Sequence, residues 1–118
     1  MSSSVPARPL DTGTPPAVIV LTTLGADADA AALARTLVDE RLAACVNVLP
    51  PMDSFYRWKG RVEADRERQL IMKTSADRVP ALEARLRQLH PYELPEFLIL
   101  GAAGGSAAYL AWVGESVG

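Results

Sequence analysis

The 118-residue sequence is poor in the side chains that bind soft metals or cross-link a chain, because it holds one cysteine and one histidine. A single cysteine cannot form an internal disulfide, and Cys45 with His90 cannot supply the three or four ligands of a structural zinc site within one chain. A transition-metal site must therefore use carboxylates or ligands from another subunit. Cys45 lies among alanine and valine residues, so we expect a core residue and not a nucleophile.

The sequence also lacks an excess of positive charge and a long hydrophobic run. Twelve basic against 14 acidic side chains give a net charge of −2, which leaves no basic surplus to neutralise a phosphate backbone. The longest unbroken apolar run, Val18 to Leu21, is far below the ~20 residues needed to span a bilayer. The first 16 residues lack the basic start and apolar stretch of a secretory signal. We expect no nucleic-acid partner, no membrane span and a cytoplasmic protein.

The remaining composition is that of an ordinary globular domain, with 49% apolar and 22% charged residues. Residues 1–16 are rich in serine, proline, threonine and glycine and are predicted to form a disordered N-terminal tail. Residues 17–118 are predicted to form a single domain.

The hydrophobic pattern of this domain alternates between strands and helices. Residues 17–23 and 97–100 are predicted to be buried strands, the first buried on both faces, and residues 42–48 a further strand. Asp27 or Asp29 is predicted to cap a helix with an apolar stripe that reaches Val38. A second helix is predicted from near Asp77 to Leu89, and a short third one, capped by Ser106, is expected to bury Tyr109.

This order of elements predicts two β-α-β units in tandem. Right-handed crossovers place both helices on one face of a four-stranded antiparallel sheet. The predicted fold class is therefore α+β, a ferredoxin-like β-α-β-β-α-β sandwich with an extended β-hairpin and a short C-terminal helix.

A long hairpin is predicted around the dipeptide Lys59-Gly60. A two-residue turn there pairs Tyr56 with Glu63 and Asp53 with Arg66, until Pro50 and Pro51 shift the register with a bulge. Roughly 15 residues extend on each side of the turn, where strands average about five or six. The hairpin should therefore overhang the sheet.

An overhanging hairpin exposes apolar side chains that a small monomer cannot cover. Phe55, Tyr56 and Trp58 lie on it, so they are predicted to form an interface in a closed homo-oligomer. The alternative is that the two prolines fold the hairpin back over its own sheet.

Reactive side chains are densest in residues 90–96, between the second helix and the last strand. An imidazole and two carboxylates can coordinate copper, zinc or nickel, although His90 can also cap the helix, and Glu93 or Glu96 can pair with arginine. Lys73 lies at a strand end, where it meets an anion or is solvated. No glycine loop for phosphate and no G-x-S-x-G elbow is present, so we do not expect an enzyme.

Five motifs in the same order resemble the CutA divalent-cation tolerance family, over about residues 17–117. They are Leu42–Asn47, Tyr56–Gly60, Met72–Thr74, His90–Glu96 and Tyr109–Trp112. The resemblance implies a ferredoxin-like subunit in a cytoplasmic homotrimer whose hairpins extend onto neighbouring subunits. It also implies tolerance to copper and other divalent metal ions, with no established reaction.

The resemblance implies copper ligands at a first-strand cysteine and at the histidines of the HPYE motif. In this chain Thr22 and Leu89 stand at two of those positions, so the expected metal ligands are His90 and Glu96. No metal ion is expected to be needed for folding. The alternative function is a trimeric scaffold or signalling protein that resembles PII regulators and binds a small molecule between subunits through Lys73, Tyr92 and Glu93. The protein partner of either is unknown.

Overall fold

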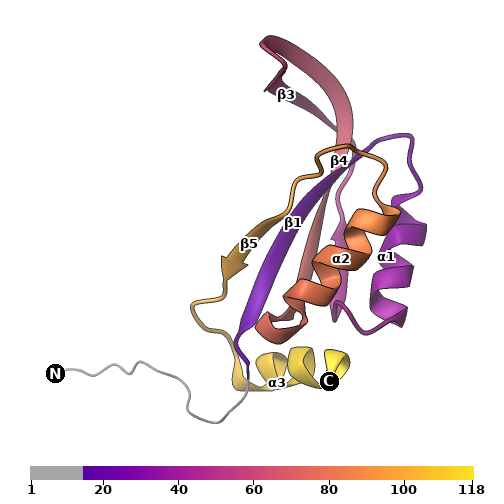
Figure 1. Cartoon of the computed structure of the whole chain (residues 1–118). Coiled ribbons are helices and arrows are strands. Elements are labelled where there is room, and N and C mark those ends of the chain that lie inside the picture. The colour runs from indigo at the N-terminus through magenta and orange to yellow at the C-terminus, as the bar shows by residue number, and fades with distance from the viewer. Residues whose placement is uncertain (1–14) are drawn as a thin grey trace, which may run out of the picture.

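The computed structural model describes residues 15–118, so almost all of the predicted tail, residues 1–16, lies outside the described residues. The α+β element order that the sequence predicts is confirmed (Figure 1). The strands are β1 (Ala17–Gly25), β2 (Cys45–Val48), β3 (Met52–Trp58), β4 (Arg61–Ser75) and β5 (Leu98–Gly101). The helices are α1 (Ala30–Asp39), the 3-10 helix η2 (Ala76–Arg78), α2 (Val79–Leu89) and α3 (Ala107–Val117).

The sheet has the order β2-β4-β1-β5 with every neighbour antiparallel, and β3 extends it by pairing with the outer half of β4. Helices α1 and α2 cover one face, and α3 lies at the end of the sheet where β1 begins (Figure 1). This is the ferredoxin-like fold that the element order predicts.

The helices begin where the sequence supplies caps. The Asp29 carboxylate accepts a hydrogen bond from the Ala32 amide at 3.0 Å, and α2 accommodates a proline in its first turn, where no amide donor is needed. The predicted apolar stripes are correct except at their ends, because Val38 and Leu89 are 41% and 36% exposed. Val38 is turned by about 100° from Leu37, which faces the sheet, and Leu89 is the last residue of α2.

The core lies between the sheet and these two helices. Side chains of β1 alternate between buried and half-buried, so the prediction that this strand is buried on both faces is wrong. The reason is that α1 and α2 cover only one face. The largest side chains sealed in the core are Leu37, Leu70, Met72, Leu82 and Leu86.

One polar group in this core has no partner. Thr22 is completely buried on the helix-covered face of β1, and its hydroxyl oxygen makes no hydrogen bond within the described part of the chain. An unpaired buried hydroxyl costs about 1 to 3 kcal/mol, and valine has nearly the same shape. We therefore expect Thr22→Val to raise the free energy of unfolding by about 1 kcal/mol in urea titration. A loss of stability would show that the hydroxyl has a partner.

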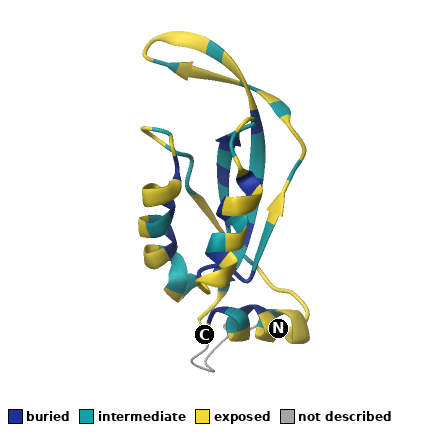
Figure 2. Ribbon diagram, turned by 90° about the vertical axis from the view of Figure 1, so that its right-hand side faces the viewer, coloured by how far each residue is buried: buried dark blue, intermediate teal, exposed yellow. Residues whose placement is uncertain are grey.

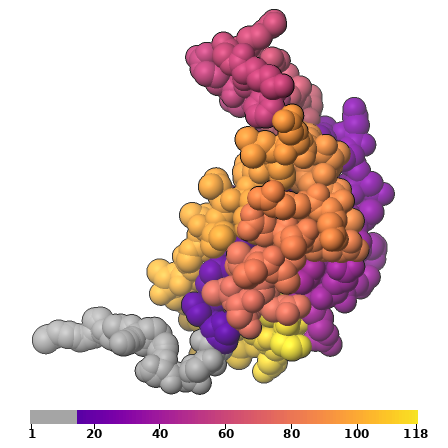
Figure 3. All heavy atoms as spheres, in the orientation of Figure 1, coloured from indigo at the N-terminus to yellow at the C-terminus, as the bar shows by residue number. Residues whose placement is uncertain are grey.

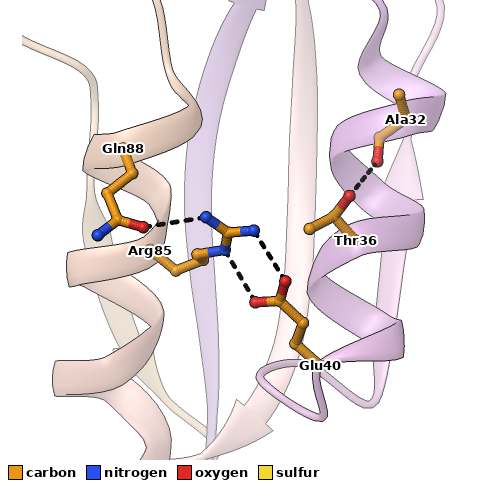
Figure 4. A network of polar contacts seen from close by, with 5 residues as sticks. All are labelled: Ala32, Thr36, Glu40, Arg85 and Gln88. Atoms are coloured by element: carbon orange, nitrogen blue, oxygen red, sulfur yellow. Dashed lines mark hydrogen bonds and ion pairs between the residues drawn. The ribbon is translucent and has the colours of Figure 1, made fainter.

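An ion pair joins the C-terminal end of α1, at Glu40, to α2. Arg85 donates two hydrogen bonds of 2.8 Å to the Glu40 carboxylate and a third, of 3.0 Å, to Gln88 (Figure 4). The hydrogen bond to Glu40 raises the pKa of Arg85, so the guanidinium stays charged. Because the pair is exposed to solvent, it orients the helices and contributes little to stability.

The hairpin has the predicted register. Tyr56 pairs with Glu63, and Asp53 pairs with Arg66 through an ion pair of 3.0 Å. Continuing that register would place Ile71 opposite Val48, but the structure pairs Val48 with Leu70. The one-residue shift falls at Pro50 and Pro51, and it is the predicted bulge.

The hairpin extends beyond the body of the domain, as predicted. Figure 3 shows it as a projection above the rest of the molecule, and the molecule measures 50 × 34 × 23 Å along its principal axes. The alternative in which the prolines fold the hairpin flat over its own sheet is not adopted. Lys59 and Gly60 both have positive φ, of 51° and 80°, which gives the hairpin its tight turn.

The sheet face opposite α1 and α2, called the open face below, has an apolar centre. Strand pairing places its side chains together: Ile19, Leu21, Cys45, Asn47, Ile71, Lys73, Leu98 and Leu100. The predicted buried strand at residues 97–100 is instead an exposed edge, since Leu98, Ile99 and Leu100 of β5 are at least half exposed (Figure 2). Among residues 15–118, no second layer covers them.

Two further expectations of burial are wrong for a single chain. Cys45 is half-buried on the open face and not in the core. Tyr109 of α3 is 43% exposed, because α3 buries Val113 and Val117 against Ala44 instead. Ser106 caps α3 as predicted, and its hydroxyl accepts from the Tyr109 amide at 3.2 Å.

Candidate functional site

An open groove lies between the curled hairpin and the loop of residues 90–97. Its volume is about 970 Å³. One wall is formed by β3 and the facing part of β4, and the other by the end of β1 and the loop. The groove therefore brings together the two regions that the sequence predicts to be functional.

Most of the predicted site residues line this groove. They are Phe55, Tyr56, Trp58, Tyr92, Glu93 and Glu96. Lys73 does not join them within one chain. It lies on the open face six residues along β4 from Glu67, which is about 20 Å at ~3.3 Å per residue.

His90 lies beneath the loop and is only 7% exposed. Its Nε2 is 2.6 Å from the carbonyl oxygen of Thr23 in β1, and its Nδ1 is 3.1 Å from the amide nitrogen of Tyr92. The His90 amide, at the C-terminal end of α2, donates to the Leu86 carbonyl at 2.8 Å, whereas the imidazole contacts the β1 carbonyl and not a carbonyl of the helix that it was expected to cap. The imidazole is thus held by backbone groups on both sides.

Two side chains of the loop are bound to the central strand β4. The Tyr92 hydroxyl donates to the Glu67 carboxylate at 2.7 Å. Glu96 accepts from the Gln69 amide at 3.2 Å, and the same amide nitrogen donates to the Thr22 carbonyl at 2.7 Å. These contacts fix the orientation of both loop side chains over the end of the sheet.

Two tyrosine hydroxyls in the groove donate to carboxylates. The hydrogen bond to Asp65 and the negative charge of that group raise the pKa of Tyr56 to about 12. Burial and the hydrogen bond to Glu67 raise the pKa of Tyr92 still further above its ordinary value. At neutral pH both phenols are protonated donors.

These raised pKa values predict a loss of stability in alkali. A tyrosine whose pKa is higher in the folded than in the unfolded protein stabilises the folded state. This stabilisation is complete below the unfolded pKa of about 10 and is lost as the pH rises through the folded pKa. We expect the free energy of unfolding to fall between about pH 10 and pH 12, and to fall less in Tyr92→Phe. Urea titrations at several pH values measure the difference. Identical pH dependence in the wild type and the variant would contradict the bond to Glu67.

Carboxylates outnumber basic groups on the groove walls. Asp27, Asp65, Glu67, Glu93 and Glu96 face two guanidinium groups, those of Arg57 and Arg66. Within residues 15–118, however, no three histidine, cysteine, aspartate or glutamate side chains are grouped so that they could hold a metal ion. Thr22, at the position where the family resemblance implies a cysteine, is sealed in the core.

Sequence reasoning did not identify the two β4 residues that hold the loop. Glu67 is 6% exposed, although it lies in a run of charged residues that looks uniformly solvated. Its burial arises because Tyr92 crosses above it, a contact between residues 25 apart in sequence. Only the contact with Tyr92 distinguishes Glu67 from Glu63 and Asp65, which precede it in the same strand.

Comparison with known proteins finds similarity over nearly the whole domain. The family model described as CutA1 divalent ion tolerance protein matches residues 18–116. A divalent-cation tolerance protein CutA from Thermus thermophilus is 44% identical over 100 residues, which cover 85% of this chain and 97% of the relative. A protein of the same name from Pectobacterium atrosepticum is 43% identical and covers 86% of this chain and 92% of the relative.

Solved structures agree with these matches. The divalent cation tolerance protein Cut A1 from Thermus thermophilus superposes with a TM-score of 0.83 at 43% identity and covers 86% of this chain and 99% of that one. CutA from Synechococcus elongatus gives 0.82 at 37% identity, with 89% and 93% covered. The relatives are named for tolerance to cations, not for a reaction. Across the described residues, no helix is both long and apolar enough to cross a membrane.

Proposed function

Because this chain belongs to the CutA1 divalent ion tolerance family, we propose that it acts in tolerance to divalent cations as a homotrimer that binds copper or another divalent ion weakly. The observation that carries the proposal is the open face. Its apolar centre and the exposed edge strand β5 leave Leu98 and Leu100 at 58% and 50% exposure in one chain. An apolar sheet face without a covering layer is stable only when another layer packs on it.

The proposed symmetry follows from the hairpin. The hairpin that carries Phe55, Tyr56 and Trp58 projects beyond the body of the domain, so in the proposed assembly it contacts a surface of the neighbouring subunit other than that subunit's own hairpin. In the proposed assembly these contacts run head to tail, each hairpin onto the next subunit, and such contacts form a ring when the rotation between subunits closes. Three subunits form the smallest such ring, and in it the open faces pack around one axis.

In this trimer a divalent ion is bound by carboxylates from more than one subunit, because residues 15–118 of one chain do not provide a complete set of ligands. Glu96 lies at the edge of the groove, half-buried and oriented by Gln69. Glu93 and the other groove carboxylates offer further oxygen ligands when subunits approach one another. His90 was expected to be a ligand with Glu96, but both of its ring nitrogens are occupied by backbone groups in this conformation. A set of oxygen ligands makes the site weak for copper.

We expect Glu96→Gln to weaken the binding of Cu²⁺ about tenfold, since it removes a charged ligand and keeps the shape of the side chain. Isothermal titration of the wild type and the variant measures the effect. Glu83→Gln is the matched control, because Glu83 lies on the outer side of α2 and pairs with Arg87. Equal affinities for wild type and Glu96→Gln would remove Glu96 from the site.

A second function is favoured by the size of the groove and by Lys73. A groove of about 970 Å³ is large enough for a small molecule, and Lys73 on the open face has no ion pair within residues 15–118. In a trimer that resembles PII regulators, Lys73 of one subunit approaches Tyr92 and Glu93 of the next and binds an anionic metabolite between them. A thermal-shift screen of divalent metals against nucleotides and other metabolites separates the two functions.

A further inference from the structure

The protonation state of His90 follows from its two neighbours. The Thr23 carbonyl oxygen can only accept a hydrogen bond, so the nitrogen 2.6 Å away, Nε2, carries the proton. The Tyr92 amide can only donate, so Nδ1 accepts with its lone pair at 3.1 Å. His90 is therefore a neutral imidazole of one defined tautomer, and neither nitrogen retains a free lone pair.

A metal ion would have to displace one of these partners. Binding through Nε2 removes its proton from the Thr23 carbonyl, and binding through Nδ1 leaves the Tyr92 amide without its acceptor. Each loss leaves a backbone group unpaired in a region where His90 is only 7% exposed. Leaving a buried donor or acceptor unsatisfied costs about 1 to 3 kcal/mol, which a weak site has to overcome.

The contacts of His90 are instead suited to holding the loop. Its ring joins β1, through Thr23, to the first free amide of the loop, since Pro91 has no amide hydrogen. The ring also packs against the edge of the Tyr92 ring, with the centroids 4.7 Å apart and an interplanar angle of 63°. Tyr92 then donates a hydrogen bond to Glu67 on β4. Glu96, four residues after Tyr92, accepts one from Gln69 on the same strand.

We infer that His90 is a positioning residue, which anchors the loop of residues 90–97 to β1, and that it is not a ligand of a divalent ion. The anchor fixes the start of the loop, and the bonds of Tyr92 and Glu96 to β4 fix its remainder. The positioning role does not depend on the proposed function. The predicted effect of His90 on ion binding does rest on the proposed function, because it requires that Glu96, which the loop carries, is a ligand.

Two amide substitutions separate the two bonds of the imidazole. In His90→Asn the amide oxygen takes the place of Nδ1 and still accepts from the Tyr92 amide, but the shorter side chain does not reach the Thr23 carbonyl. In His90→Gln the amide nitrogen reaches Thr23, and nothing accepts from Tyr92. Both variants remove the imidazole, so a metal-ligand role predicts the same loss of ion affinity in both.

The experiment is hydrogen exchange of the Tyr92 amide in the wild type and both variants, together with Cu²⁺ titration. Loss of one buried hydrogen bond predicts Tyr92 exchange about tenfold faster in His90→Gln, and within about threefold of the wild type in His90→Asn. Cu²⁺ affinity should be retained in His90→Asn and weakened in His90→Gln, because only the second variant releases the loop that carries Glu96.

Two results would overturn the inference. Unchanged Tyr92 exchange in His90→Gln would show that His90 does not anchor the loop. An equal, about tenfold loss of Cu²⁺ affinity in both variants would make the imidazole itself a ligand. Failure of the Glu96→Gln prediction is a separate result, because the exchange measurement uses the protein without any ion and decides the positioning role alone.

Discussion

Leu98→Lys is expected to convert the proposed trimer into monomers. Leu98 lies on β5, 58% exposed in one chain, and faces the same side of the sheet as Leu21 and Ile71. In the proposed trimer that side chain is buried against a neighbouring subunit, where an ammonium group without a partner carries a large desolvation cost. Threefold symmetry places the same charge in all three interfaces, so the cost is paid at every contact.

Sedimentation velocity at micromolar concentration measures this change. The variant should sediment with the 12.6 kDa mass of one chain, in a range where the wild type is expected to sediment as the proposed trimer. Val38→Lys is the matched control, because Val38 is 41% exposed on the helix side of the molecule and should tolerate the charge. A Leu98→Lys protein that sediments like the wild type would place β5 outside the interface.

Leu37→Ala should be strongly destabilising. The Leu37 side chain is completely buried between α1 and the sheet, and the Leu37 carbonyl accepts hydrogen bonds from the Leu42 and Ala43 amides that close the turn after α1. Removal of the isobutyl group leaves a cavity among tightly packed core residues. Such a change costs about 2 to 5 kcal/mol.

Urea unfolding at one fixed protomer concentration measures this cost, because unfolding and dissociation are coupled in an oligomer. Val38→Ala is the control on the neighbouring residue of the same helix, and its largely exposed side chain predicts a loss below about 1 kcal/mol. Equal losses in the two variants would contradict the assignment of the core to the face of α1 that carries Leu37.

Sequence patterns predicted the elements whose cause is local. The Asp29 and Ser106 caps, the turn at Lys59 and Gly60, and the hairpin register depend on residues near one another in the chain, and the structure confirms each of them. The register shift at Pro50 and Pro51 was also predictable, because proline cannot donate to a ladder. The ferredoxin-like topology followed from element order and crossover handedness.

Burial was predicted less well, because it depends on which faces are covered. An apolar run such as Leu98 to Leu100 has the same sequence pattern whether it is buried in its own chain or by another subunit. The prediction of a buried strand therefore failed for one chain at β5. The same reasoning applies to Cys45 and Tyr109, which were expected to be buried and lie at exposed or half-exposed positions.

The candidate site was predictable as a segment and not as a set of contacts. Residues 90–96 were identified by their density of reactive groups, and most of the predicted residues do share one groove. The partners of that segment are distant in sequence. Thr23 is 67 residues from His90, Glu67 is 25 from Tyr92, and Gln69 is 27 from Glu96, so no local pattern indicates them. They decide what the histidine does, since they occupy or orient the groups around it.

The association state of the wild-type protein decides whether the open face is a subunit interface. Sedimentation equilibrium across the micromolar range should give a mass of about 38 kDa, three times the 12.6 kDa of one chain, independent of loading concentration. This mass is expected because the open face, the edge strand β5 and the projecting hairpin are all covered only in a closed ring. A stable folded species of 12.6 kDa at the same concentrations would contradict it.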